Sequence, residues 1–405
     1  MDTSRSSRLS RRPGPVRRRR RTVALSVLAL AALLAAVAGA VVGLSDDGGA
    51  RQSSGARAGP GPGAPAGPRA RASDRPSAAR AMSLERRVGE LLVMSFDERV
   101  APPYILRRLR TGQGTGVVLF AKNAPDPATA RALTSRLQKA AGGSALVATD
   151  QEGGPIRTLP FAPPDASQGR LGAPGAAGQA ARDAARGLRA NGVNVNLAPV
   201  ADVAESPGSV VSGRAFPGDA RAVAGLTGAA TRAYRRERVG ATAKHFPGLG
   251  RATENTDEAP VTLPAPKAAL HGSDLVPFRA AIEAGTPLIM SSHALYPALD
   301  PRRIASQSAA VLQALLRDQL GFRGAVITDS IEAQAVLDRS DVAEAAERSV
   351  TAGNDLILMT GSGSFNQVQP RLLARARRDS RFRARVTESA DRVLKLKRRL
   401  GLRIG

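Results

Sequence analysis

The chain has 405 residues, three histidines and no cysteine, and its formal net charge is +25. This length is enough for one large barrel of about 250 residues or for two medium domains. The lack of cysteine excludes disulfide frameworks, thiol nucleophiles and thiolate metal sites. No two histidines have the spacing of helix-borne zinc ligands, although His245 and His293 could still meet a carboxylate in space. We expect neither a metal ion nor a cofactor.

Much of the positive charge lies near the N-terminus. Residues 1–80 contain fifteen Arg, no Lys, four Asp and no Glu, which accounts for +11 of the total of +25. The sequence has no Trp and few aromatic residues that could stack on bases, so we expect no nucleic-acid partner. A basic adaptor for envelope surfaces or nucleic acid is a weaker alternative.

The N-terminal segment has the pattern of a membrane anchor. Residues 17–21 are consecutive arginines at the end of a basic tail, residues 1–21, and residues 22–44 are uncharged and rich in Ala, Leu and Val. A helix of that length can cross a hydrocarbon core of about 30 Å, with the basic flank in the cytoplasm. Ala38-Gly39-Ala40 also fits a signal-peptidase site. We expect a single-pass cell-membrane protein with an extracytoplasmic domain, or a secreted protein if the segment is cleaved.

Residues 45–80 are mainly Gly, Pro, Ala, Ser and Arg. Such a segment buries too little apolar surface to offset its ordering entropy, so we expect a disordered linker. Residues 81–405 have a globular composition, and we expect them to form one monomeric domain.

The globular part alternates short apolar strands with helical patterns. Strands are predicted at 93–96, 116–120, 145–149, 193–197, 240–244, 288–291, 325–328 and 356–359. Helices are predicted between them at 104–110, 127–140, 176–190, 219–237, 271–284, 306–319 and 342–352, and after them at 367–377 and 382–399. This alternation predicts a (β/α)8 TIM barrel. A doubly wound open sheet is the alternative, because periodicity alone does not prove closure.

Polar residues follow five of the predicted strands. They are Asp150 to Gly154, Asn196 to Asp202, Lys244-His245, Ser291 to His293, and Thr328 to Ser330. In a parallel barrel the carboxyl ends of the strands form the active face. Five polar clusters at that end are poorly explained by turns and helix caps alone.

The stretch from Lys244 to Gly250, Lys-His-Phe-Pro-Gly-Leu-Gly, resembles the N-terminal barrel domain of glycoside hydrolase family 3. It is most similar to the single-domain bacterial β-N-acetylglucosaminidases of that family. The resemblance covers roughly residues 82–359 and implies a retaining hydrolase of terminal β-linked sugars, with a carbohydrate substrate of cell-wall origin. It also implies that Asp329, directly after a strand, is the nucleophile that forms a covalent glycosyl-enzyme.

The resemblance further assigns sugar binding to a group of strand-end and loop residues. Asp150 matches a carboxylate that receives hydroxyls, Lys244 and His245 match paired donors, and Arg214, in Ser-Gly-Arg-Ala-Phe, matches a hydroxyl-binding arginine. His293 joins this set. After Glu152-Gly153-Gly154 the family commonly has Arg-Val-x-Arg, whereas this chain has Pro-Ile-Arg-Thr, so Arg157 takes the place of the second arginine out of register.

The general acid is where this chain departs from the family. The N-acetylglucosaminidase branch has Asp-Ser-His in the loop after the Lys-His motif, and its histidine protonates the leaving oxygen. This chain has Asn255-Thr256-Asp257 there, with no histidine between Leu249 and Ala259. We therefore expect Asp257 to act as acid/base with a raised pKa, with Glu254 and Glu258 as alternates. A catalytically inactive barrel that binds sugar or peptidoglycan is the alternative function.

Overall fold

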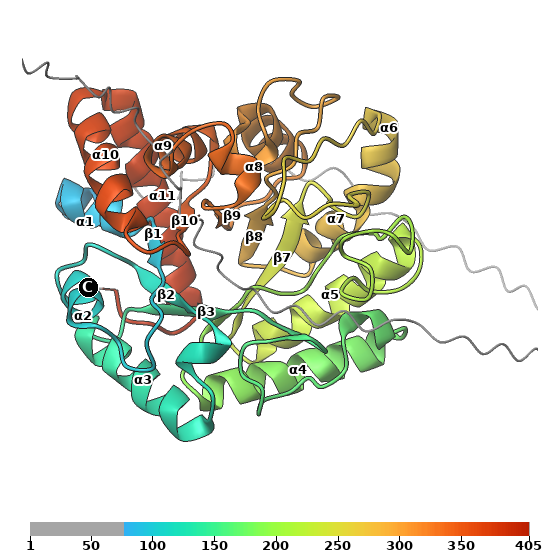
Figure 1. The fold of residues 1–405 in the computed structure, drawn as a ribbon, viewed down its shortest axis with the longest axis horizontal. Helices are drawn as coiled ribbons and strands as arrows, with labels where there is room; N and C mark the ends of the chain where they lie inside the picture. The colour runs from blue at the N-terminus through green and yellow to red at the C-terminus, as the bar shows by residue number, and fades with distance from the viewer. Residues whose placement is uncertain (1–76, 405) are drawn as a thin grey trace, which may run out of the picture. The chain divides into compact units, whose positions relative to one another are not determined.

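The computed structural model describes residues 77–404. In this part of the chain, eight parallel strands close into a barrel in the order β1-β10-β9-β8-β7-β6-β3-β2 (Figure 1). The predicted barrel is therefore confirmed, and the open sheet is excluded. The strands are β1 (Leu92–Met94), β2 (Gly116–Leu119), β3 (Leu146–Thr149), β6 (Val195–Asn196), β7 (Gly240–Phe246), β8 (Leu288–Ser291), β9 (Ala325–Ser330) and β10 (Leu356–Leu358).

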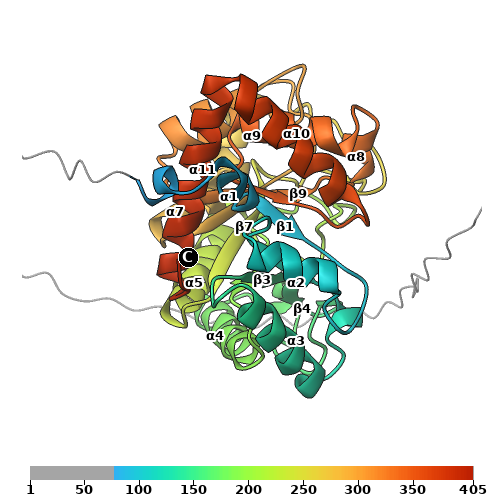
Figure 2. The same ribbon diagram turned by 90° about the vertical axis from the view of Figure 1, so that its left-hand side faces the viewer.

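Helices surround this ring of strands, as the two views in Figures 1 and 2 show. Several begin at N-cap residues: Ser83, Asp126 and Asp219 each accept hydrogen bonds from backbone N–H groups of the first turn. The main helices are α1 (Leu84–Gly89), α2 (Pro103–Arg110), α3 (Pro127–Ala140), α4 (Pro174–Ala190), α5 (Ala220–Arg236), α7 (Val276–Glu283), η6 (Ala310–Gln319), α9 (Val342–Ala352), α10 (Ser364–Arg378) and α11 (Ser380–Arg399).

Short turns change the starts of two predicted helices, while the other predicted helices start within three residues of the observed ones. The helix predicted at 271–284 is divided into a π-turn, η4 (Leu270–Asp274), and α7. Pro277 lies in the first turn of α7, where its missing N–H is tolerated, so the helical ladder restarts there. The helix predicted at 306–319 begins later because Ala305–Gln307 form a 3-10 turn and the hydroxyl of Ser308 accepts from the N–H of Val311.

Each barrel strand is buried on both faces, as parallel strands usually are. Side chains such as Val118, Ala148 and Ile327 pack inside the barrel, while Val117 and Val326 belong to the clusters under the surrounding helices. This burial explains why the strands appear in the sequence as short continuous apolar runs.

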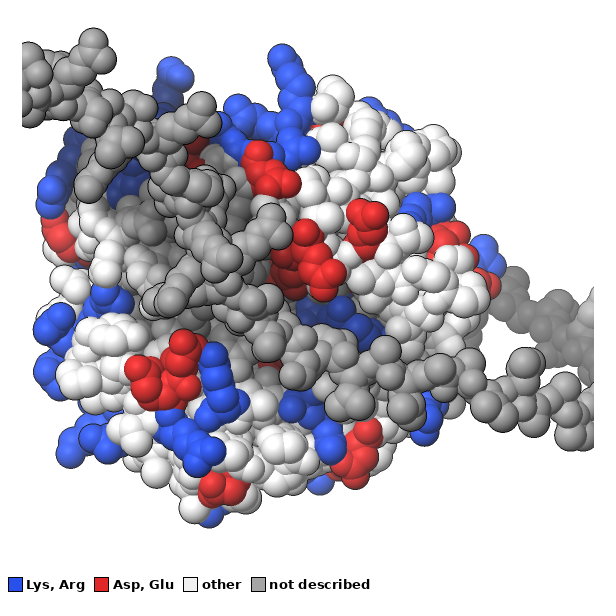
Figure 3. Space-filling view, in the orientation of Figure 1, with Lys and Arg blue, Asp and Glu red and all other residues white. Residues whose placement is uncertain are grey.

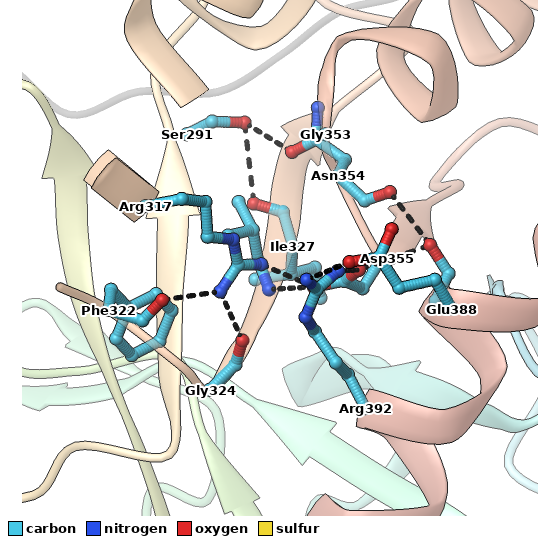
Figure 4. A network of polar contacts seen from close by, with 12 residues as sticks. Ser291, Arg317, Phe322, Gly324, Ile327, Gly353, Asn354, Asp355, Glu388 and Arg392 are labelled. Atoms are coloured by element: carbon cyan, nitrogen blue, oxygen red, sulfur yellow. Dashed lines mark hydrogen bonds and ion pairs between the residues drawn. The ribbon is translucent and has the colours of Figure 1, made fainter. Parts of the chain in front are cut away.

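An ion cluster at the amino end of β10 joins the C-terminal helices to the barrel (Figure 4). Asp355 is fully buried and accepts hydrogen bonds from Arg317 (2.7 Å), Arg385 (2.6 Å) and Arg392 (3.1 Å), as well as from the N–H of Val326 (2.9 Å). Burial works to raise the pKa of Asp355, but the three guanidinium groups outweigh it and lower the pKa. The cluster lies at the end of the barrel opposite the strand-end polar residues, where residues usually serve stability.

A short β-hairpin was not predicted. Directly after β3, a hairpin pairs β4 (Gln151–Gly153) with β5 (Ile156–Arg157). Gly153 and Gly154 form its turn with φ angles of +101° and +59°, which glycine adopts without a steric penalty. The hairpin follows Asp150 and contains Glu152, so it adds a second carboxylate to this part of the barrel mouth.

The predicted tail (1–21), anchor or signal segment (22–44) and linker (45–80) lie outside the described residues, apart from 77–80. Within residues 77–404, no helix is long and apolar enough to span a bilayer. On the face drawn in Figure 3, Lys and Arg side chains are spread around the outline and alternate with acidic side chains.

Candidate active site

The carboxyl ends of the strands surround a pocket of about 340 Å³. Strand-end residues from β3, β7 and β9 line it together with the loop after β7. Four residues predicted from the sequence meet there: Asp150, Lys244, Asp257 and Asp329. The other lining residues are Val118, Phe120, Leu197, Met290, Ser330, Glu332, Ala333, Leu358 and Thr360.

Two glycines give the loop after β7 its path. Gly248 has a backbone φ of +131°, which residues that carry a side chain rarely adopt. Gly250 packs so closely on the loop after β6 that an added Cβ would lie 1.8 Å from the carbonyl oxygen of Val203. The turn that leads from His245 to Asp257 therefore favours glycine at both of these positions.

A network of alternating charges forms one side of the site. The Nζ of Lys244 lies 2.6 Å from Asp150 Oδ1 and 2.6 Å from Glu152 Oε1. The guanidinium of Arg214 binds both oxygens of Glu152, with Nε to Oε2 at 2.9 Å and an Nη to Oε1 at 2.7 Å. The two carboxylates and two cations thus fix one another's positions.

Burial and charge act in opposite directions in this network. Burial works to raise the pKa of Glu152, but Lys244 and Arg214 outweigh it and lower the pKa to about 2. Burial likewise disfavours the charged form of Lys244, yet Asp150 and Glu152 raise the pKa of Lys244. Glu152 raises the pKa of Arg214 in the same way. The side chain of Asp150 is 30% exposed while that of Glu152 is 2% exposed, so Asp150 is the carboxylate that a ligand can reach.

His245 is oriented by a carboxylate behind it. Its Nδ1 lies 2.7 Å from Asp202 Oδ2, and its backbone N–H donates to Asp202 Oδ1 at 3.0 Å. Asp202 is fully buried and also accepts from the N–H of Leu249 at 2.7 Å. The opposite nitrogen, Nε2, therefore points toward Asp329, and the distance to Oδ2 is 4.0 Å, which exceeds a hydrogen bond.

Asp329 lies near the end of β9 and points into the pocket. Its Oδ1 accepts from the N–H of Ser330 at 2.8 Å. Burial works to raise its pKa, but His245, His293 and Lys244 with this N–H outweigh burial and lower the pKa. Burial lowers the pKa of His293, whereas Asp150 and Glu152 raise that of Lys244. Asp329 is therefore ionised under ordinary conditions.

Asp257 is shifted in the opposite direction. Desolvation by the surrounding pocket wall and the negative charge of Asp329 raise its pKa, although the residue remains accessible to solvent at the rim. Its N–H donates to Asn255 Oδ1 at 3.1 Å. The carbonyl groups of Thr256 and Asp257 accept from the backbone at the start of α8 (Gln334–Leu337) at 3.1 Å. These contacts hold the loop beside the end of β9.

The alternates for the general acid lie elsewhere. Glu254 lines a separate hollow formed by residues 251–254 and 260–265. Asp257 and Glu258 are both exposed, but only Asp257 is part of the pocket wall that contains Asp329. The geometry therefore favours Asp257 among the three carboxylates that the loop offers.

Four predicted binding residues lie outside the pocket lining: Arg214 and His245, which contact residues beside it, and His293 and Arg157. His293 is buried behind it, where Nδ1 lies 2.7 Å from the Oγ of Ser306 and Nε2 lies 2.9 Å from the carbonyl of Ser330. Arg157, the last residue of β5, pairs with Asp165 in the loop that follows. In this structure His293 supports the backbone next to Asp329, and Arg157 contacts no residue of the pocket wall through a hydrogen bond or ion pair among residues 77–404.

Sequence reasoning missed Glu152, Asp202 and Glu332 as parts of the site. Each lies within or next to a strand-end cluster that the sequence had already identified. Their roles depend on partners 28 to 92 positions away, such as Thr360 for Glu332 and Lys244 for Glu152. Among the described residues, no group of three or more His, Asp or Glu side chains is arranged to hold a metal ion.

A barrel mouth with two acidic residues whose pKa values are shifted apart has the features of a site for acid/base and nucleophilic catalysis. Residues 83–396 match the model of the glycosyl hydrolase family 3 N terminal domain. The chain therefore belongs to this family and is a glycoside hydrolase that acts on β-linked sugars, which confirms the resemblance found in its motifs.

Relatives and solved structures agree with this assignment. An uncharacterized secreted glycosyl hydrolase of Arthroderma benhamiae is 31% identical over 336 residues, 80% of this chain and 95% of the relative. A β-hexosaminidase of Xanthomonas oryzae pv. oryzae is 36% identical over 60% of this chain and 75% of its own length.

Two solved structures are similar in fold. The β-N-acetylhexosaminidase of Beutenbergia cavernae is 34% identical, with a TM-score of 0.71 over 78% of this chain and 98% of that one. The family 3 β-N-acetylglucosaminidase of Paenibacillus sp. str. FPU-7 is 33% identical, with a TM-score of 0.75 over 80% of this chain; the match spans 64% of that longer chain.

Proposed function

We propose that this glycoside hydrolase removes terminal β-linked N-acetylglucosamine from glycans of cell-wall origin by a retaining mechanism. The main support is that Asp329 and Asp257 line one pocket and have pKa shifts of opposite sign. This is the combination that a nucleophile and a general acid require. The preference for an N-acetylated sugar follows the names of the relatives, which are β-hexosaminidases and β-N-acetylglucosaminidases.

In the first step, an oxygen of Asp329 attacks the anomeric carbon while the bond to the leaving oxygen breaks. Asp257 gives its proton to that oxygen, and a glycosyl ester forms on Asp329. In the second step, the Asp257 carboxylate takes a proton from water, the water oxygen attacks the same carbon, and the ester bond to Asp329 breaks. Two displacements on opposite faces retain the β configuration.

Substrate binding in this proposal depends on the charged network beside the pocket. Asp150 accepts sugar hydroxyls, while Lys244 and Arg214 act as donors whose positions Glu152 fixes. His245 presents Nε2 to the sugar because Asp202 holds its other side. Rigid polar groups of this kind reduce the entropy lost when the sugar binds.

We also propose that the catalytic domain works outside the cytoplasm, anchored through residues 22–44 or released by cleavage of that segment. The basic flank and apolar stretch support this, and one relative is described as secreted. Cell-wall glycans are found in that compartment, so the location agrees with the proposed substrate.

A panel of chromogenic β-glycosides tests the function. Wild type should hydrolyse the β-N-acetylglucosaminide, and mass spectrometry after rapid quenching should detect a sugar bound to the peptide that contains Asp329. The Asp329→Asn variant should lose turnover and the adduct, while Asp318→Asn, on the exposed surface of η6, should keep both. Sugar binding without turnover by wild type would instead support the catalytically inactive barrel.

A further inference from the structure

A hollow of about 610 Å³ is formed by segments that follow β8 and β9, two neighbouring strands of the barrel (Figure 1). We call it the arginine hollow, because four of the residues that line it are arginines. Its polar lining residues are Asp300, Arg302, Arg303, Gln307, Arg339 and Arg348. None of them lines the catalytic pocket. The arginine hollow is therefore a separate space, and the proposed mechanism uses none of its side chains.

The loop after β8 holds two of the arginines side by side. Oδ1 of Asp300 accepts from the backbone N–H groups of Arg302 and Arg303 at 3.0 and 3.1 Å, and Oδ2 accepts from the Oγ of Ser308 at 2.7 Å. Burial works to raise the pKa of Asp300, but these donors outweigh it and lower the pKa. Both oxygens of this acidic lining residue are thus used to shape the loop.

Three of the four arginines have no acidic partner among the described residues. Arg302, Arg303 and Arg339 are exposed, and within residues 77–404 their guanidinium groups form no ion pair or hydrogen bond. Arg348 pairs with Glu344 at 2.6 Å. Guanidinium groups stay protonated in proteins, so the wall has a clear excess of positive charge. A concave wall with one sign of charge attracts ligands of the opposite sign.

A buried amide adds a neutral donor to this wall. Gln307 is 5% exposed, and its Nε2 is buried without a hydrogen-bond partner among residues 77–404. Its backbone N–H donates to the carbonyl of Ile304 at 2.8 Å, which fixes the residue in a short 3-10 turn. A buried donor without an acceptor carries a desolvation cost. A ligand that brings acceptor oxygens to the hollow would offset this cost.

We propose that the arginine hollow binds a phosphate ester or a diphosphate, with Gln307 as a neutral donor beside the arginines. The planar guanidinium group binds two phosphate oxygens at once, so several of them together favour a ligand with more than one negative charge. A volume of about 610 Å³ is in the range of sites for small organic molecules, which leaves room for the group that carries the phosphate. The inference does not rest on the proposed function, because the two sites share no lining residue.

Calorimetric titration of the full chain with inorganic diphosphate and with glycerol 3-phosphate tests the site. An ionic strength of about 0.15 M screens long-range attraction. The double variant Arg302→Gln/Arg339→Gln removes two unpaired arginines. The matched control is Arg131→Gln/Arg136→Gln, which changes two exposed arginines of α3 outside the hollow. Both double variants lower the net charge by the same amount, so the basic residues 1–80 contribute equally to each.

Wild type should bind at least one of the two probes at a single saturable site. Arg302→Gln/Arg339→Gln should weaken this binding about 10²-fold, which is about tenfold for each charged donor, while the control should stay within twofold of wild type. Tighter binding of diphosphate would identify a diphosphate ligand, and tighter binding of glycerol 3-phosphate would identify a phosphate ester. Equal losses in the two double variants, or no saturable binding by wild type, would overturn the proposal.

Gln307→Leu tests the neutral donor. It should weaken binding of the tighter probe about threefold to tenfold. Urea unfolding without a probe should show no loss of stability, because Nε2 has no hydrogen-bond partner to lose among residues 77–404. Binding by Gln307→Leu as tight as that of wild type would contradict the role assigned to Gln307.

Discussion

Replacing Glu152 by Gln removes the negative charge between two cations. In wild type its oxygens contact Lys244 Nζ at 2.6 Å and Arg214 at 2.9 and 2.7 Å. These contacts lower the pKa of Glu152 from its ordinary value of 4.5 to about 2. A shift of roughly 2.5 pKa units, at about 1.4 kcal/mol per unit, corresponds to about 3 to 4 kcal/mol of stability in the ionised state. Glu152→Gln should lose an amount of this order at pH 7.

The loss should depend on pH in a defined direction. Because the folded-state pKa of Glu152 is lowered, its contribution is fully present above about pH 4.5 and disappears as pH falls toward 2. Urea unfolding of wild type and Glu152→Gln between pH 7 and pH 3 measures the difference in free energy of unfolding. That difference should be constant near neutrality and shrink below pH 4.5.

Asp150→Asn provides the matched control. The side chain of Asp150 also pairs with Lys244 but is 30% exposed, so its removal should cost less stability and should mainly raise KM for the sugar. The reasoning would be refuted if Glu152→Gln were as stable as wild type at pH 7. A stability difference that stayed the same down to pH 3 would equally contradict it.

Three further predictions follow from the site and the fold. The kcat/KM of wild type should fall as pH rises through the raised pKa of Asp257, since that group must be protonated to act as the acid. Asp257→Asn should remove this fall from the pH profile and should lower the rate about 10²- to 10⁴-fold on a substrate with a poor leaving group. A pH profile that Asp257→Asn leaves unchanged would exclude Asp257 as the acid. Asp202→Asn should lower kcat/KM about tenfold to a hundredfold, because His245 loses a charged acceptor at 2.7 Å. If kcat/KM measured with a series of sugars is unchanged in Asp202→Asn, His245 does not need the charge of Asp202. Asp355→Asn should reduce the free energy of unfolding by about 3–5 kcal/mol, because three arginines lose their buried partner. The KM of the folded enzyme should stay constant. Urea denaturation measures the change in stability, and steady-state kinetics on the same variant measures KM.

The regular elements were largely predictable because their signals are local. The strand predicted at 288–291 and the helices predicted at 127–140 and 342–352 agree with β8, α3 and α9 at both ends. Short apolar runs indicate strands that are buried on both faces, and periodic apolar positions indicate helices packed on one face. The β4-β5 hairpin was missed because its strands are two or three residues long and its residues are mostly polar.

The sequence by itself determined the alternation of strands and helices, the polar residues at strand ends, and the family motif around Lys244 and Asp329. Tertiary structure decided that the sheet closes, that Asp257 rather than Glu254 or Glu258 lines the same pocket as Asp329, and that Glu152 rather than Asp150 is the buried anchor of the charged network. The physical reason is that propensity and periodicity act between neighbours along the chain. Burial, ion pairing and pKa shifts depend on distances between groups that only the folded barrel brings together.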